Sequence, residues 1–300
     1  MNIVQCNAVS KSYGNVAALD EVTFSIKQDT ITGIIGRNGA GKTTLLKLIA
    51  GYWKHSKGDI HVFSENPFNS LTVSANMIYI DDQMTFPDAM PLHSILTEAA
   101  RFYPNWDAKL AKRLFDYFSF HPNQFHDHLS KGKKSTFNTI IGLASRCALT
   151  IFDEPTTGMD EAVRNDFYRA LLRDYIVAPR TILISSHHLN EIEHLLEDVL
   201  LIDRGRVKLH LSIDALQQYA IGVTGNQAVL SQWANDQEIL FSKDDGENSL
   251  FLVVRNNVSK EKMDQLLRLG IKPTSISPAE LCLYMTQLKK GGIDDVFRDA

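Results

Sequence analysis

The 300-residue sequence has few cysteines and no long apolar run. Its three cysteines, Cys6, Cys147 and Cys282, are widely spaced and form no CxxC pair. We therefore expect reduced thiols packed as small hydrophobic side chains, not disulfides or a metal site. No stretch approaches the roughly 18 apolar residues of a membrane span, and the first residues lack the apolar segment of a signal peptide. These absences predict a cytoplasmic protein.

The sequence also lacks an excess of basic residues. It has 31 Lys and Arg residues against 35 Asp and Glu, which gives a formal net charge of −4. Proteins whose main task is to coat nucleic acid usually carry a surplus of positive charge, so no nucleic-acid partner is expected. With 44% hydrophobic residues, the chain can form one large globular domain and a smaller one.

Strand-like and helix-like segments alternate through the first two thirds of the chain. Short β-rich runs such as Glu21–Ile26 are followed by segments with helical apolar spacing, and a helical stretch at about 91–129 interrupts this rhythm. Strands that alternate with helices favour a parallel sheet with helices on its faces. Beyond Gly222 the order strand, helix, two strands, helix, strand predicts a ferredoxin-like α+β domain. Its helices are expected at 227–234, 260–270 and 279–290.

The segment GRNGAGKT, residues 36–43, has the pattern of a phosphate-binding loop and lies between a predicted strand and a predicted helix. Glycines let backbone N–H groups close around phosphates, and the helix N-terminus adds a positive dipole. Lys42 would reach the β- and γ-phosphates, and the Thr43 hydroxyl would bind Mg²⁺. The residues expected to bind nucleotide here are Gly36, Arg37, Asn38, Gly39, Ala40, Gly41, Lys42, Thr43 and Thr44.

Two later strands also end in polar residues. The run CALTIFDE places Asp153 and Glu154 at the carboxyl end of a buried strand, the edge at which open α/β sheets bind ligands. Asp153 is suited to hold Mg²⁺, directly or through water, and Glu154 to polarise an attacking water. The run TILISSHH ends at His187 in the same way. A histidine after a strand is more often structural than catalytic, but this strand end is the third expected to meet one phosphate.

These segments, in this order, resemble the ATP-binding cassette (ABC) ATPases over about residues 1–211. That family has an aromatic residue before its first long strand, then a phosphate loop, a glutamine loop, an LSGGQ-type signature, an aspartate-glutamate strand end, a D-loop and a switch histidine. At the remaining places this chain has Tyr13, Gln83, the segment LSKGK at 129–133, and TTGMD ending at Asp160.

Two of these segments depart from the family pattern. After MIYI the chain reads Asp81, Asp82 and Gln83, so either Asp82 or Gln83 stands at the position of the family's glutamine. The segment LSKGK keeps Ser130 and Gly132, which the resemblance brings to the γ-phosphate bound by a partner cassette. Lysines replace the family's first glycine and its glutamine.

The signature lysines fall in the first turn of a predicted helix whose N-cap is Ser130. Cations there oppose the helix dipole, at a cost of about 0.3–1 kcal/mol each, and an anion from a partner would reverse that sign. Our hypothesis for Lys131 is that it stabilises the γ-phosphate across a dimer interface, in addition to Lys42. For Lys133 and Lys134, side chains that simply face solvent are an equal alternative.

The resemblance implies a P-loop NTPase fold with a mostly parallel sheet, an antiparallel β subdomain and an inserted helical subdomain at about 88–145. The cassette would span 1–218 and the accessory α+β domain 219–300. The resemblance also implies an ATPase in which two cassettes, identical or different, hold ATP and Mg²⁺ between them.

The resemblance assigns the expected roles as follows. Glu154, His187 and Lys42 would act in catalysis. Tyr13 would stack on adenine, and other nucleotide contacts would come from Ser130, Lys131, Gly132 and Asp160. The metal would be bound by Thr43, Asp153 and Gln83.

A single cassette followed by roughly 80 residues resembles the ATPase subunits of ABC-2-type exporters, in particular small bacterial ones that handle peptides or antibiotics. This predicts a subunit that powers transport by ATP-driven dimerisation at the cytoplasmic face of the cell membrane. A membrane permease would dock near residues 82–95. Two alternatives stay open: a low-activity regulatory cassette paired with another ATPase, and a soluble ABC-type switch that acts on nucleic acid or ribosomes.

Overall fold

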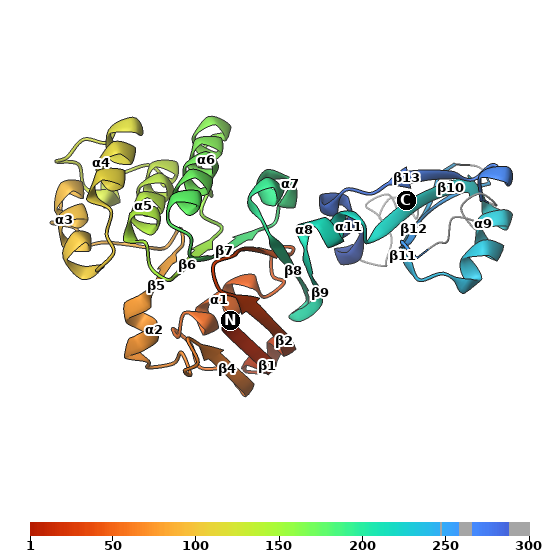
Figure 1. Ribbon diagram of the computed structural model, residues 1–300, viewed down its shortest axis with the longest axis horizontal. Coiled ribbons are helices and arrows are strands. Elements are labelled where there is room, and N and C mark those ends of the chain that lie inside the picture. Colours follow the sequence, from red (N-terminus) through yellow and green to blue (C-terminus); the bar gives the residue numbers. More distant parts are fainter. Residues whose placement is uncertain (247, 258–265, 288–300) are drawn as a thin grey trace, which may run out of the picture. The chain divides into compact units, whose positions relative to one another are not determined.

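The chain forms two compact units, Met1–His210 and Leu211–Ala300 (Figure 1). The computed structural model describes residues 1–246, 248–257 and 266–287 of the sequence. The first unit carries the segments of the predicted nucleotide site, and the second carries the predicted accessory domain.

The first unit is built around a six-stranded sheet. In spatial order its strands are β5 (Met77–Ile80), β6 (Leu149–Asp153), β7 (Thr181–Ser186), β3 (Ile31–Ile35), β8 (Asp198–Asp203) and β9 (Arg206–Ser212). The pairs from β5 to β8 are all parallel. Strands β3, β5, β6 and β7 are buried along their whole length, which explains their continuous apolar sequences. The mostly parallel sheet predicted from the sequence is confirmed.

A separate antiparallel sheet covers helix α1 (Lys42–Ile49). Its strands, in spatial order, are β2 (Val16–Lys27), β1 (Asn2–Tyr13) and β4 (Lys57–Val62). Val4 and Leu19 of this sheet share one buried cluster with Leu45 of α1 and Ile34 of the central sheet. The predicted antiparallel subdomain is therefore present, and its core holds α1 against the central sheet.

The helical block is inserted between β5 and β6, as the sequence predicts. It contains α3 (Leu92–Phe102), α4 (Ala108–Tyr117) and α5 (Lys131–Ser145), and α5 contacts both other helices. A further short helix, α2 (Leu71–Asn76), precedes β5 and was not predicted. Only Val73 of α2 is buried, so its six residues carry no apolar periodicity.

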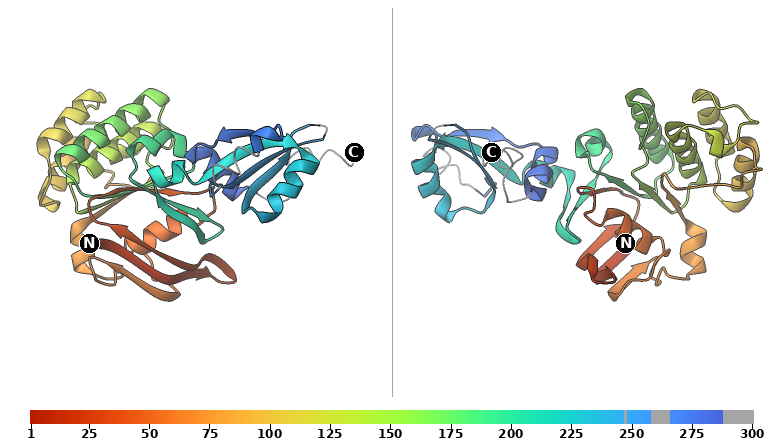
Figure 2. Two further views of the ribbon diagram at one scale, coloured as in Figure 1. Left: turned by 45° about the vertical axis from the view of Figure 1, so that its right-hand side comes forward. Right: turned by 180° about the vertical axis from the view of Figure 1, so that it is seen from behind.

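The helices lie on both faces of the central sheet. Figures 1 and 2 show α3 to α6 on one side and α1 with the antiparallel sheet on the other. Helix α6 spans Glu161–Val177 and α7 spans Leu189–Ile192. Short 3-10 helices lie at His126–His128, Glu193–Leu195 and Ala234–Asp236. In the part of the chain that the structure describes, no helix is both long and apolar enough to cross a membrane.

The second unit contains a four-stranded antiparallel sheet. In spatial order its strands are β11 (Ile239–Asp244), β12 (Ser249–Arg255), β10 (Ala220–Asn226) and β13 (Lys272–Ser275). The third strand in sequence lies between the first and the second, which is the arrangement of the predicted ferredoxin-like fold. Helix α9 (Gln227–Trp233) contributes Leu230 to a core shared with Val223 and Leu252.

The division between the units falls after His210, whereas the sequence placed it after residue 218. The difference comes from helix α8 (Ile213–Gln217), which packs against α11 (Pro278–Thr286) of the second unit. The helix predicted at 260–270 lies mostly outside the described residues. The last three residues of the helix predicted at 279–290 also lie outside them.

A buried ion-pair network fixes α6 to the end of α5. The Asp174 carboxylate of α6 is 2% exposed and receives Arg146 Nη2 at 2.8 Å and Arg180 Nη2 at 2.9 Å. Arg146 also lies 2.9 Å from Asp107, the N-cap of α4. Because Arg180 is itself buried, its guanidinium depends on Asp174 for a counter-charge.

Asp174→Ala should lower the free energy of unfolding by about 3–5 kcal/mol, because it leaves the charge of Arg180 buried without a partner. Asp20→Ala, which removes an exposed pair with Arg206, is the matched control and should cost at most about 1 kcal/mol. Urea unfolding followed by tryptophan fluorescence measures both. Similar small losses in the two variants would contradict this account of the network.

Candidate nucleotide-binding site

The phosphate loop connects β3 to α1 and its lysine folds back over it. Lys42 Nζ donates to the carbonyl oxygens of Gly36 at 2.7 Å and of Arg37 at 3.4 Å. Gly36 has no room for a side chain, since a Cβ there would lie 2.3 Å from the carbonyl oxygen of Ile202. The N-cap of α1 is Gly41, with φ 107° and no side chain to accept from the first turn. The N–H groups at this helix end are thus suited to an anion.

A buried carboxylate lies at the end of β6. Asp153 is 5% exposed; its Oδ1 accepts a hydrogen bond from Ser185 Oγ at 2.6 Å and its Oδ2 accepts one from Tyr79 OH at 2.7 Å. Burial, together with the charge of Asp153, raises the pKa of Tyr79, so its hydroxyl stays protonated and donates. Ser185 also accepts from the backbone N–H of Glu154 at 2.8 Å. One serine therefore connects both acidic residues of this strand end.

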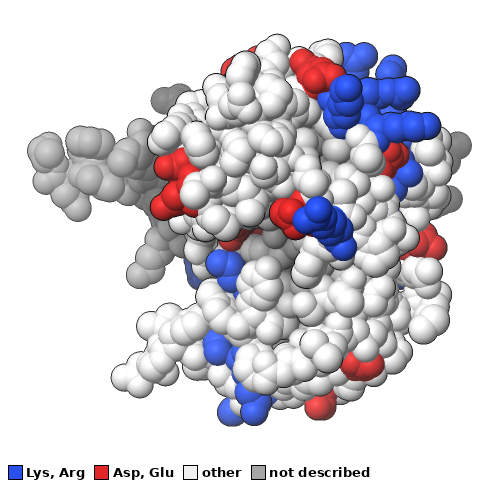
Figure 3. All heavy atoms as spheres, turned by 90° about the vertical axis from the view of Figure 1, so that its left-hand side faces the viewer, with Lys and Arg blue, Asp and Glu red and all other residues white. Residues whose placement is uncertain are grey.

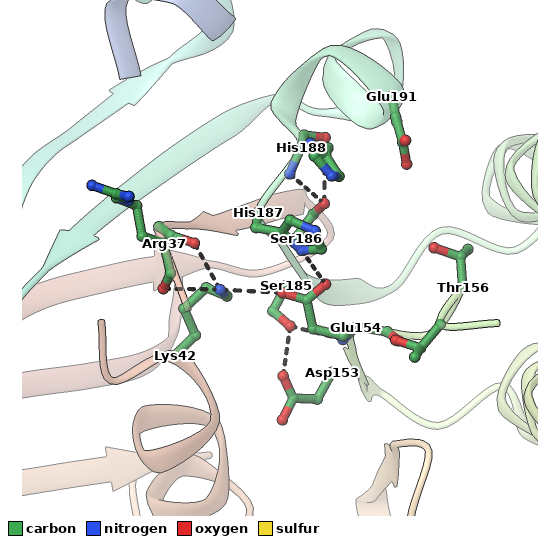
Figure 4. Close-up of polar contacts among 12 residues, drawn as sticks. Arg37, Lys42, Asp153, Glu154, Thr156, Ser185, Ser186, His187, His188 and Glu191 are labelled. Atoms are coloured by element: carbon green, nitrogen blue, oxygen red, sulfur yellow. Dashed lines mark hydrogen bonds and ion pairs between the residues drawn. The ribbon is translucent and has the colours of Figure 1, made fainter. Parts of the chain in front are cut away.

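Lys42, Glu154 and His187 form a chain of contacts between the start of α1 and the ends of β6 and β7 (Figure 4). Glu154 Oε1 lies 3.1 Å from Lys42 Nζ, and Glu154 Oε2 lies 3.0 Å from His187 Nδ1. Glu154 has φ 48°, a left-handed conformation that is uncommon for a residue with a side chain. Its carbonyl accepts from the Thr157 N–H and hydroxyl, which maintains this turn. The structure brings the three predicted catalytic residues together.

The residues predicted to bind metal supply oxygen atoms, the ligands that Mg²⁺ prefers. Asp153 is the last residue of β6, and Thr43 is an exposed residue in the first turn of α1. Gln83 Nε2 donates to Asp82 Oδ1 at 3.0 Å, so its carbonyl oxygen is the atom that a cation would use. This donor set fits Mg²⁺, which commonly binds one or two carboxylates together with substrate phosphates and water.

The signature segment begins α5, and Ser130 is its N-cap as predicted. The Ser130 hydroxyl accepts from the Lys133 N–H at 3.4 Å. Gly132 lies against the D-loop, since a Cβ on it would be 2.3 Å from the carbonyl oxygen of Gly158. The Lys133 ammonium donates to the carbonyl of Phe118 at 2.6 Å and lies 4.9 Å from the Phe120 ring centroid. Lys133 is thus exposed, as in the solvent-facing alternative, but its ammonium also has protein partners.

Lys131 lies beside the glutamine loop of its own chain. Its ammonium is 3.0 Å from Asp82 Oδ2, although the side chain is 61% exposed. The adjacent Asp81 lies 3.7 Å from Lys47 of α1 and accepts from the Gln83 N–H. The two loop carboxylates therefore have different partners, one on α5 and one on α1.

The remaining predicted nucleotide contacts lie near the ends of elements. Tyr13 ends β1; it is 45% exposed and packs edge-on against Trp53 with ring centroids 5.7 Å apart. Asp160 is the N-cap of α6 and accepts from the Val163 N–H at 2.9 Å. Ser185 and Tyr79 were not among the predicted site residues. The polar end of TILISS indicated Ser185, whereas Tyr79 lies in an apolar run with nothing to distinguish it.

The pattern of the ABC transporter family matches residues 19–157. Residues 19–157 thus form an ABC transporter ATP-binding cassette. The chain is 27% identical over 221 residues to the ABC transporter ATP-binding protein YtrB of Bacillus subtilis, covering 74% of this chain and 76% of that protein. The SkfA peptide export ATP-binding protein SkfE of the same organism is 25% identical over 241 residues, covering 79% and 100%. The bacitracin transport ATP-binding protein BcrA of Bacillus licheniformis is 27% identical over 242 residues, covering 72% of each.

Solved structures show the same fold for the cassette. The ATP-binding subunit of an ABC transporter superposes with a TM-score of 0.64 at 24% identity, covering 72% of this chain and 92% of that one. A dimeric cassette described as a post-hydrolysis state bound to ADP and Pi has a TM-score of 0.60 at 18% identity, covering 70% and 98%. The P-loop NTPase fold expected from the sequence is thereby established.

Ser185→Ala and Tyr79→Phe should each lower the free energy of unfolding by about 1–3 kcal/mol, because each removes a hydrogen bond from the buried carboxylate of Asp153. The double variant should lose more than the sum of the two, since Asp153 then keeps neither donor. Urea unfolding of the three variants measures this. Strict additivity would mean that the two hydroxyls do not act on one carboxylate.

Proposed function

We propose that this protein is the ATP-binding and ATP-hydrolysing subunit of an ABC exporter. The observation that carries the proposal is the chain of contacts from Lys42 through Glu154 to His187, which brings a phosphate-binding cation, a general base and a polar hydrogen-bonding group to one edge of the sheet. The names of two relatives, which give peptide export for SkfE and bacitracin transport for BcrA, support export as the direction.

ATP binding would exchange the partners of Lys42. The Lys42 side chain is 6% exposed, and the Glu154 carboxylate provides the counter-charge of its ammonium. A buried ammonium without a counter-charge is costly. An entering phosphate must therefore take over from Glu154 as the anion that pairs with Lys42. Glu154 then becomes able to accept a proton from water while the phosphate neutralises Lys42. The phosphate and the glutamate therefore compete for one cation in this proposal.

His187 would act beside the same carboxylate. Its Nδ1 contacts Glu154, and its side chain is 42% exposed at the end of β7. From this position the ring can orient Glu154 and donate a hydrogen bond to the γ-phosphate. Thr43, Asp153 and Gln83 would hold Mg²⁺, which would neutralise charge on the β- and γ-phosphates when bound.

Two cassettes would complete each site. Ser130 and Gly132 begin α5, and the Ser130 side chain is exposed, so they are accessible to nucleotide carried by a second cassette. The second cassette can be a copy of this chain or a different one. A low-activity regulatory cassette is less well supported, because Glu154 and His187 are both present and in contact.

The permease would dock in a groove beside the glutamine loop. The groove has a volume of about 800 Å³ and is bounded by α1, α2, β5 and the end of α3. An apolar pocket of about 430 Å³ adjoins it and shares Met84, Phe102 and Tyr103. Figure 3 looks onto this hollowed face of the cassette. An apolar pocket beside this groove supports a docking helix of a membrane permease, and hence a peripheral position at the cytoplasmic face of the membrane.

Glu154→Gln should lower ATP turnover by about 100-fold or more, because glutamine cannot accept the proton of the attacking water. The variant should still bind ATP and should accumulate a closed dimer, which size-exclusion chromatography with light scattering detects. Glu161→Gln, a change of an exposed carboxylate at the start of α6, is the matched control. Appreciable hydrolysis by the Glu154 variant would assign the base to another residue.

Phe102→Asp should reduce copurification with a membrane permease about tenfold, because it places a charge in the apolar pocket that adjoins the groove. The Phe102 side chain is 69% exposed, so ATP binding by the isolated protein should not change. Ile176→Asp, an equally exposed apolar position on α6 away from the groove, is the control. Unchanged copurification of the Phe102 variant would exclude this groove as the docking site.

A further inference from the structure

The Asp82–Lys131 ion pair joins two segments that are far apart in the sequence. Lys131 Nζ lies 3.0 Å from Asp82 Oδ2, and Gln83 Nε2 donates to the other oxygen, Oδ1, at 3.0 Å. Asp82 thus receives a donor on each oxygen. The pair connects the glutamine loop, which borders the groove, to the first residue of the signature helix α5.

The Asp82 carboxylate interacts favourably with both the Lys131 ammonium and the N-terminus of α5. Burial opposes ionisation of Asp82, but the hydrogen bonds from Gln83 and Lys131 and the charge of Lys131 lower its pKa. A lysine in the first turn of α5 opposes the helix dipole, and a carboxylate at the same place favours it. Asp82 therefore supplies the anion that the basic start of α5 needs when no phosphate is near.

Lys131 also lies against the D-loop. A Cβ added to Gly158 would be 3.1 Å from Lys131 Cγ, and Gly132 packs on the carbonyl of Gly158. The stem of Lys131 is thereby confined on one side by the D-loop while its ammonium is held by the glutamine loop. A movement of either loop would change where this ammonium can reach.

We propose that the Asp82–Lys131 pair is a releasable latch that keeps Lys131 on its own chain until the γ-phosphate of a partner cassette's ATP replaces the carboxylate. The latch rests on the proposed function, since it requires ATP-driven dimerisation. In the free chain, Lys131 would hold the glutamine loop through Asp82. In the dimer, Lys131 would contact the phosphate of the partner's ATP. A partner segment in the groove that draws Asp82 away would favour the same exchange, which gives the permease a route to promote dimerisation.

The test uses the full chain carrying Glu154→Gln, so that ATP is retained. Adding Asp82→Asn should lower the ATP concentration for half-maximal dimerisation about fivefold, because Lys131 no longer has to leave a carboxylate. In a background of Lys131→Gln the same change should have no effect, because the latch has no lysine to release. Asp116→Asn, an exposed carboxylate on α4, is the control and should leave the ATP dependence unchanged in both backgrounds. Analytical ultracentrifugation across an ATP titration measures all of these.

The outcomes separate the latch from the proposed function. If the Glu154→Gln protein dimerises with ATP but Asp82→Asn does not shift the midpoint, or shifts it equally with and without Lys131, the latch is wrong. If Asp82→Asn only lowers the thermal unfolding temperature, the pair is merely structural. If the Glu154→Gln protein stays monomeric at saturating ATP, the proposed function fails, and the latch fails with it.

Discussion

The Lys42 ammonium is almost fully buried, and the architecture of the site follows from its need for a negative partner. Lys42 lies at the start of α1, which the antiparallel sheet presses against the central sheet, so the lysine cannot withdraw to water. Glu154 meets it from the end of β6, and its φ of 48° turns the carboxylate toward the phosphate loop. The same carboxylate contacts His187 at the end of β7. One cation thus couples the start of α1 to the ends of β6 and β7, and only another anion can separate them without a large desolvation cost.

The two carboxylates of this site, Asp153 and Glu154, have different surroundings. Asp153 is buried and its two oxygens accept from Ser185 and Tyr79, which restricts its orientation. Glu154 is partly exposed and paired with groups that can exchange partners. A carboxylate with fixed hydrogen bonds is suited to a constant role such as metal binding, whereas one with exchangeable ion pairs is suited to a change of state. Adjacent residues of one strand end therefore have different freedom to change partners, because their neighbours differ.

The lysine-rich start of α5 follows the same electrostatic rule at the surface. Cations at a helix N-terminus need anions nearby, and here Asp82 provides one while Lys133 donates to the Phe118 carbonyl. An ordinary signature of glycines would not need such partners. Of the two signature lysines, Lys131 contacts Asp82 of the glutamine loop directly, whereas Lys133 has partners within the helical block.

The sequence by itself determined the features that depend on local pattern. The glycine spacing at 36–41 indicated the phosphate loop, buried apolar runs predicted the parallel strands, and Ser130 was identifiable as an N-cap. It did not reveal α2, whose single buried residue leaves no periodicity, or the extent of the second unit, which depends on α8 packing against α11. The sequence also predicted that Lys42, Glu154 and His187 lie at one site, but only the tertiary structure showed the direct contacts of Lys42 with Glu154, Tyr79 with Asp153 and Lys131 with Asp82. Those contacts join segments that are far apart in the sequence. They arise from strand order and packing, about which local periodicity carries no information.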